Sequence, residues 1–111
     1  MSHTIHDEIS LEIGRRVADR LRAQPALLYV ACENLERWIQ RNSDASALVR
    51  CYREWLAILE RPLDAICEIL TSDTEEGRRL RQNSPFAGVL PPAEIWSIKR
   101  AVRNLRAKTA A

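Results

Sequence analysis

Glycine is scarce in this chain, with 3 copies among 111 residues, and β-branched residues are few. Alanine, leucine, arginine and glutamate are abundant instead, and such a mixture favours helix over strand. The length fits a single domain that is large enough to bury a core without disulfides or metal. We therefore expect one all-α domain over residues 1–111, with frayed ends at 1–3 and 107–111.

Long apolar runs and targeting signals are also lacking. No stretch approaches the ~18 consecutive apolar residues of a membrane span. The N-terminus, MSHTIHDEIS, carries acidic residues and has no apolar segment of the kind that secretory signals contain. These absences predict a cytoplasmic protein that does not partner with a membrane.

Close cysteine pairs are absent from the chain. Cys32, Cys51 and Cys67 are odd in number and widely spaced, and each falls inside an expected helix. Zinc sites typically use close pairs such as C-x-x-C, so this spacing argues against a metal centre. We expect three reduced thiols that pack as small apolar groups.

Recognisable catalytic motifs are missing as well. The chain has no G-x-S-x-G, no P-loop, no G-x-G-x-x-G and no H-E-x-x-H. His3 and His6 can reach one metal ion from one helix face, but the sequence offers no third ligand. We expect no catalytic, cofactor or metal site. An enzyme whose site is invisible in the sequence stays open as an alternative.

The segment 48–70, LVRCYREWLAILERPLDAICEIL, is the most apolar part of the chain. Its apolar residues recur at i, i+3, i+4 and i+7, which is the spacing of one helix face. The same register resumes after Pro62, whose ring removes a backbone donor and clashes with the preceding turn. We expect a break or sharp kink at Pro62, with this segment at the centre of the fold.

The remaining helices are expected at residues 4–23, 25–40, 73–82 and from Pro92 onward. Thr4 can cap the first of them, and Ser72 with Glu75 has the spacing of a capping box for the helix at 73–82. The predicted architecture is an irregular or up-down bundle of five to six helices. The expected core positions are Ile9, Ile13, Val17, Leu28, Leu35, Trp38, Leu48, Trp55, Leu59, Ile66 and Leu70.

Residues 83–92, NSPFAGVLPP, resist a helical interpretation because they combine prolines with a glycine. Phe86, Val89 and Leu90 make this segment more apolar than a simple solvent-facing linker. Two readings follow. Either Phe86 and Leu90 pack into the core and hold the loop, or they form part of a surface that binds a partner.

The last helix carries a narrow apolar seam, which suits packing against another helix within the domain or across a dimer. The seam consists of Ile95, Ile98, Val102 and Leu105. Trp96 lies about 100° away from Ile95 around the helix, close to Arg100 and Arg103. We therefore expect an aromatic ring beside a basic face.

Charge is unevenly distributed along the chain. Residues 1–75 hold nine Arg and thirteen acidic residues, a formal sum of −4, whereas residues 76–111 hold eight Lys or Arg and two Glu, a sum of +6. The basic part can contact phosphates while Trp96 stacks on a base. The candidate contacts are Arg78, Arg79, Arg81, Lys99 and Arg106. Charge complementarity within the fold or within a homodimer explains the asymmetry equally well.

Trp and Arg are the residue types that most often anchor protein interfaces. We therefore expect a non-catalytic interaction or accessory module that forms a homodimer or binds another protein. Its expected contact residues are Phe86, Leu90, Trp96, Arg100 and Arg103. The alternative function is nucleic-acid binding or regulation through residues 78–108.

Overall fold

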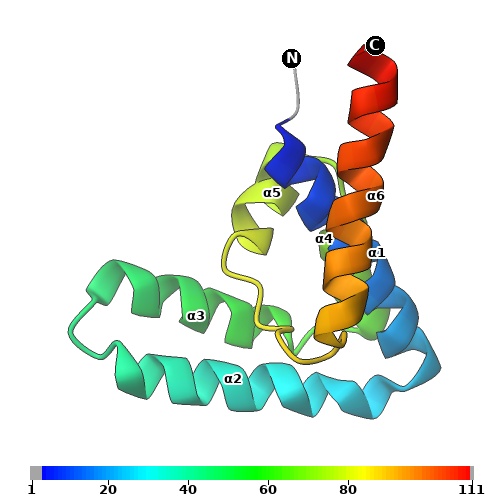
Figure 1. Ribbon diagram of the computed structural model, residues 1–111. Helices are drawn as coiled ribbons and strands as arrows, with labels where there is room; N and C mark the ends of the chain where they lie inside the picture. Colours follow the sequence, from blue (N-terminus) through cyan, green and yellow to red (C-terminus); the bar gives the residue numbers. More distant parts are fainter. Residues whose placement is uncertain (1–3, 111) are drawn as a thin grey trace.

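The computed structural model describes residues 4–110, except for the side chain of Ala110. Over these residues the chain forms six α-helices and one short 3-10 helix, and it contains no strand (Figure 1). The elements are α1 (Ile5–Ala23), η1 (Pro25–Leu27), α2 (Leu28–Arg41), α3 (Ser46–Ile58), α4 (Leu63–Thr71), α5 (Glu75–Arg81) and α6 (Pro92–Ala110). The predicted all-α bundle of five to six helices is confirmed.

Side chains cap two of the helices at their N-termini. Thr4 caps α1: its hydroxyl accepts from the Asp7 N–H at 3.1 Å, and the Asp7 carboxylate accepts from the Thr4 N–H in return. The predicted cap of α5 is wrong by two residues. Thr74 rather than Ser72 has the extended backbone that precedes the helix, and its hydroxyl accepts from the Gly77 N–H at 3.0 Å. The Ser72 hydroxyl instead bonds to that of Thr74.

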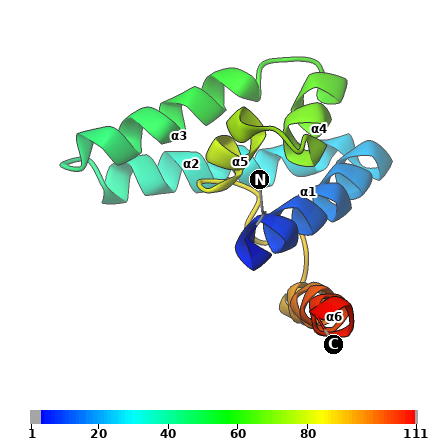
Figure 2. The ribbon, with the colours of Figure 1, turned by 90° about the horizontal axis from the view of Figure 1, so that it is seen from above.

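Pro62 separates two helices. Helix α3 ends at Ile58 and α4 begins at Leu63, and the Arg61 N–H donates to the Ile58 carbonyl oxygen in the turn between them. Proline has no N–H to continue the α3 ladder, and its fixed backbone angle suits the start of α4. Figure 2 shows α4 turning away from the line of α3. The predicted break is therefore present.

Helix α1 occupies the centre of the arrangement. It contacts α4, α5, α6 and η1, while α2 and α3 pack against each other as a pair. Figure 2 shows α1 between α6 on one side and the α2–α3 pair on the other. Segment 48–70 contributes six buried residues to the core, as its apolar pattern predicts, but only α4 packs along α1, whereas α3 pairs with α2.

The core forms where α1, α2, α3 and α4 meet, and residues of α5, α6 and the segment 83–90 complete it. Of the predicted core residues, those that are buried are Ile9, Val17, Leu35, Trp55, Ile66 and Leu70. The rest are half-buried and pack against the same cluster: Ile13, Leu28, Trp38, Leu48 and Leu59. The segment after α5 adds Phe86 and Leu90 to the core, which confirms the first of the two readings of that segment.

Gly14 marks a close crossing of α1 over α4. A Cβ atom at Gly14 would lie 2.0 Å from the carbonyl oxygen of Leu70. Glycine costs a helix ~1 kcal/mol relative to alanine. Because Gly14 has no side chain, the backbones of α1 and α4 approach each other more closely here than a Cβ atom would allow.

Helix α6 packs along α1 and continues to Ala110, and the fraying expected from residue 107 stays a prediction. Residues 1–3 and 111 lie outside the described part of the chain. Between residues 4 and 110, none of the helices has the length and apolar character that a membrane crossing requires.

Candidate functional site

A cavity of about 600 Å³ lies between α1, the start of α6 and the segment after α5. This volume falls within the ~300–1,000 Å³ that is typical of small-molecule sites. One face of α1 forms a long wall, because its lining positions recur three or four residues apart. These α1 residues are His6, Ile9, Ser10, Ile13, Gly14 and Val17.

The other walls come from segments that are distant in sequence. Helix α4 contributes Leu70 and the first turns of α6 contribute Ile95 and Trp96. The segment after α5 contributes Phe86 and Leu90, which have 4% of their surface exposed. The cavity therefore has mostly apolar walls, and it is formed where α1, α4, the end of α5, the segment after α5 and the start of α6 meet.

Asn34 on α2 holds the segment that carries Phe86 in place. The Asn34 side-chain amide donates to the Pro85 carbonyl oxygen at 2.8 Å and to the Ala87 carbonyl oxygen at 2.9 Å. Asn34 and Pro85 are both buried, so the bond between them is shielded from water, whereas the bond to Ala87 is only partly buried. The sequence does not single out Asn34, because the pattern of an amphipathic helix gives no sign that one of its amides bonds to a distant backbone segment.

Arg81, the last residue of α5, lines the cavity and is only 6% exposed. Its Nη1 atom donates to the carbonyl oxygens of Ile69 at 3.0 Å and Ser72 at 2.7 Å. Its Nε and Nη2 atoms are buried and have no hydrogen-bond partner within the described structure. Burial lowers the pKa of this guanidinium, which nevertheless stays protonated as arginine does in proteins.

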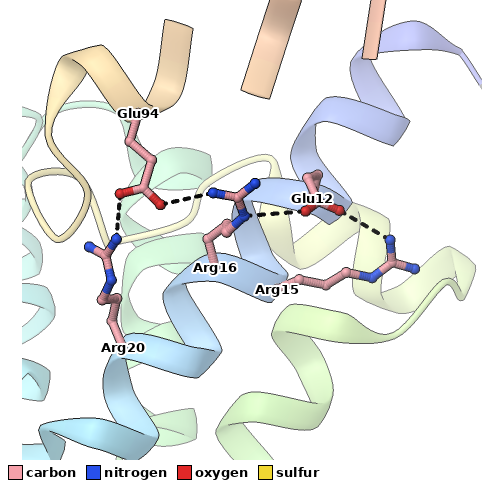
Figure 3. A network of polar contacts seen from close by, with 5 residues as sticks. All are labelled: Glu12, Arg15, Arg16, Arg20 and Glu94. Carbon is pink, nitrogen blue, oxygen red and sulfur yellow. Dashed lines mark hydrogen bonds and ion pairs between the residues drawn. The ribbon is translucent and has the colours of Figure 1, made fainter. Parts of the chain in front are cut away.

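A network of ion pairs fixes the start of α6 against α1 (Figure 3). Glu94 accepts from Arg20 and from Arg16, the latter at 3.3 Å. Arg16 also contacts Glu12, which in turn pairs with Arg15. The hydrogen bond from Arg20, aided by Arg16, holds the pKa of the Glu94 carboxyl below its usual range. The network positions the helix turn that carries the α6 wall of the cavity.

The five predicted partner-binding residues separate into two groups. Phe86, Leu90 and Trp96 come together around the cavity. The prediction that Phe86 and Leu90 present an exposed surface is wrong, because both are buried and Phe86 packs edge-on against Trp55 at 5.9 Å between ring centroids.

Trp96 borders the cavity, whereas Arg100 and Arg103 lie on the outer side of α6. Trp96 is 66% exposed at the rim of the cavity, and the Lys99 ammonium lies 5.5 Å from its ring centroid. Arg100 and Arg103 are exposed and do not line the cavity. Their role in binding a partner stays a prediction.

The predicted nucleic-acid contacts are largely engaged within the protein. Three are ion-paired: Arg78 with Asp73, Arg79 with Glu54 and Glu76, and Arg106 with Glu8. Arg79 holds the pKa of the Glu54 and Glu76 carboxyls low through hydrogen bonds. Arg81 is buried, so a phosphate could reach its guanidinium only if the surrounding side chains moved, and this contact stays a prediction. Nucleic-acid binding by the remaining residues stays a prediction.

The seam of α6 is used within the chain. Ile98 is buried, and Ile95 and Val102 are half-buried against the core, whereas Leu105 is exposed. The seam therefore gives no separate support to a homodimer, which stays a prediction.

Metal-ligating groups do not gather within residues 4–109: no set of three His, Cys, Asp or Glu side chains is placed to hold an ion. His6 is exposed at the cavity, and His3 lies outside the described residues. The three cysteines are free. Cys67 is buried, with a pKa raised by that burial, while Cys32 and Cys51 are half-buried.

No protein-family model, curated protein or solved structure matches this chain. The geometry of the cavity is therefore the basis for the functional argument.

Proposed function

We propose that this protein is a non-catalytic binding module whose ligand occupies the cavity between α1, α6 and the segment after α5. The observation that carries the proposal is the cavity itself: about 600 Å³, with mainly apolar walls and with Arg81 among its lining residues. Apolar walls with a few convergent polar groups are typical of ligand sites. The burial of apolar ligand surface supplies the driving force.

The polar groups of the cavity favour binding over catalysis. The polar side chains among its described lining residues are those of His6, Ser10, Arg81 and Ser84. Carboxylates and thiols are absent from this lining as the structure describes it. A nucleophile normally needs an adjacent base that is itself oriented by a third group. The lining offers no such arrangement.

Trp96 extends the proposed site beyond the cavity. Its ring borders the cavity and is largely exposed. Aromatic rings in this position cover the part of a ligand that projects out of a pocket. The sequence predicts an interaction module that docks a partner on an exposed surface. In the function proposed here, residues 83–92 instead form walls of the ligand cavity.

Methyl NMR with decan-1-ol as a neutral apolar probe tests the proposal. Titration should shift the δ1-methyl signals of Ile9, Ile13 and Ile95, which line the cavity. The Ile39 methyl group on α2 does not line it and should stay unchanged. Uniform shifts, or none at the cavity methyls, would overturn the proposal.

A pair of matched variants locates the binding site. Ser10→Phe places a ring inside the cavity and should abolish the decanol shifts. Ser97→Phe adds the same ring on the exposed side of α6, where Ser97 does not line the cavity, and should leave binding intact. Equal loss in both variants, or loss in neither, would contradict a cavity site.

A further inference from the structure

We infer that the ligand of this cavity is an organic carboxylate with an apolar body, and that Arg81 binds its carboxylate. This inference rests on the proposed function and names the ligand class of the same site. It starts from a buried cation whose hydrogen bonds are incomplete. Buried polar groups are nearly always hydrogen-bonded, so an orphaned guanidinium edge calls for an explanation.

The free donors of Arg81 form one side of its planar group. Nε–H and one N–H of Nη2 point in the same direction, parallel to each other, on the edge opposite Cδ. A carboxylate places its two oxygens at the matching separation and accepts both bonds. The free edge of Arg81 therefore has the shape of a carboxylate receptor.

The third nitrogen atom sets the orientation of that edge. Nη1 donates to the carbonyl oxygens of Ile69 and Ser72, which lie at the C-terminal end of α4. These two bonds prevent the guanidinium from rotating freely. The receptor edge is thus oriented before any ligand arrives, which reduces the entropy lost on binding.

The charge that Arg81 requires is not supplied by the cavity lining. None of the described residues that line the cavity is an acid. Asp73 and Asp7 attract the Arg81 charge from a distance, and Arg78 and Arg15 repel it, but none of them bonds to Nε or Nη2. An external anion is the group that completes the hydrogen bonds of both atoms.

The apolar walls favour a monovalent carboxylate over a phosphate. One carboxylate and one guanidinium make a neutral pair, which is the arrangement that a dry site tolerates. A phosphate monoester carries a charge of about −1.5 to −2 near neutral pH and would leave excess charge among apolar side chains. The volume left by the pair suits an alkyl chain or a ring.

Binding includes a local rearrangement around Arg81. Its Nε and Nη2 atoms each expose less than 1 Å². The incoming carboxylate must therefore displace the side chains that cover them. We expect chemical shifts to change around Arg81 with decanoate in addition to the changes at the isoleucine methyls.

Three ligands of equal chain length test the inference on the unaltered protein. Decanoate should bind about tenfold or more tightly than decan-1-ol, since hydrogen bonds to charged groups are the stronger kind. Decylammonium should bind more weakly than decan-1-ol because it meets a like charge. All three titrations use the methyl signals of Ile9, Ile13 and Ile95.

Variants then assign the preference to Arg81. Arg81→Met should remove the preference, so that this variant binds decanoate no more tightly than it binds decan-1-ol. Arg81→Lys keeps the charge but loses the paired donors, and should retain only part of the preference. Arg100→Met makes the same replacement at an exposed position outside the cavity and should change nothing.

The outcomes separate the two proposals. Equal affinity for decanoate and decan-1-ol would overturn the carboxylate inference and leave the binding module standing. Binding of none of the three ligands would overturn both. If Arg81→Met does not fold because the α4 carbonyls lose their partner, the comparison of ligands on the unaltered protein and Arg81→Lys still decides the inference.

Discussion

The indole Nε1 of Trp55 donates a hydrogen bond of 2.9 Å to the backbone carbonyl oxygen of Leu80. Trp55 is 1% exposed, and its ring meets Phe86 edge-on at an interplanar angle of 85°. One side chain therefore joins α3, α5 and the segment that lines the cavity. The position of Phe86 depends on this contact, so the core and the candidate site share a support.

Truncation of Trp55 should destabilise the protein strongly. Trp55→Ala removes a large buried side chain and should lower the free energy of unfolding by ~3–5 kcal/mol. Trp55→Phe keeps an aromatic ring but removes the indole N–H, which leaves the Leu80 oxygen without its donor. The loss of this hydrogen bond should lower the free energy of unfolding by ~1–3 kcal/mol. Urea denaturation measures both, with the exposed Trp96→Ala as the control. A loss at Trp55 no larger than that at Trp96 would contradict the described core.

Gly14→Ala separates helix propensity from packing. Propensity alone predicts a gain of ~1 kcal/mol, because alanine favours helix over glycine. The structure predicts a net loss of ~1–3 kcal/mol, since the new Cβ would meet the Leu70 carbonyl at 2.0 Å and force α1 away from α4. Ser10→Ala, at a half-buried position on the same helix, serves as control. A more stable Gly14→Ala protein would show that the two helices do not cross so closely.

The features of the fold that depend on local chemistry can be predicted from the sequence. Helix periodicity and proline placement located the helices and the break at Pro62, because backbone hydrogen bonding and rotamer preference act over a few residues. The buried state of Trp55 followed from the same periodicity. The predicted cap at Ser72 is wrong because Thr74 also carries a hydroxyl group and lies directly before the first residue of α5.

The candidate site was much harder to predict. Arg81 sits in a short polar helix, so its burial follows from the way α4, α5 and α1 meet rather than from local pattern. Asn34 and Pro85 are distant in sequence, and no periodicity links an amide to a remote carbonyl. The apolar residues and prolines of segment 83–92 mark it as unusual in the sequence, but tertiary contacts decide whether Phe86 faces the core or the solvent.

The Glu94 network predicts a pH-dependent contribution to stability. Because hydrogen bonds from Arg20 and Arg16 lower the pKa of Glu94, its ionised form stabilises the folded state. That contribution is fully present above the ordinary glutamate pKa of ~4.3 and is lost as the pH falls through the lower folded-state pKa. Glu94→Gln should therefore melt at a lower temperature than the parent at pH 7, and the difference should vanish in acid.

Thermal unfolding followed by circular dichroism across this pH range measures the effect. Glu36→Gln, at an exposed position on α2, removes a carboxylate outside the network and serves as control. If the difference in melting temperature between Glu94→Gln and the parent stays constant with pH, the ionised Glu94 carboxylate does not stabilise the fold.

Asn34→Ala should loosen the cavity as well as the fold. The change leaves the Pro85 and Ala87 carbonyl oxygens without donors, and we expect a loss of ~2–4 kcal/mol in the free energy of unfolding. Amide exchange should quicken in residues 84–90, and decan-1-ol should bind more weakly because Phe86 loses its fixed position. Asn104→Ala, exposed on α6, is the control. Unchanged exchange in this segment would show that Asn34 does not anchor it.

Trp96 and Arg103 distinguish the cavity from the exposed face of α6. Trp96 borders the cavity, whereas Arg103 lies outside it, and both are exposed. Both Trp96→Ala and Arg103→Ala should therefore keep the parent melting temperature.

Their effects on ligands should differ. Trp96→Ala should weaken decan-1-ol binding about fivefold, equivalent to ~1 kcal/mol of lost apolar contact, while Arg103→Ala leaves it unchanged. If the basic face instead binds nucleic acid, Arg103→Ala should reduce salt-sensitive binding to single-stranded DNA, as fluorescence anisotropy measures. A large effect of Arg103→Ala on DNA, combined with no effect of Trp96→Ala on decan-1-ol, would move the functional site from the cavity to the outer surface of α6.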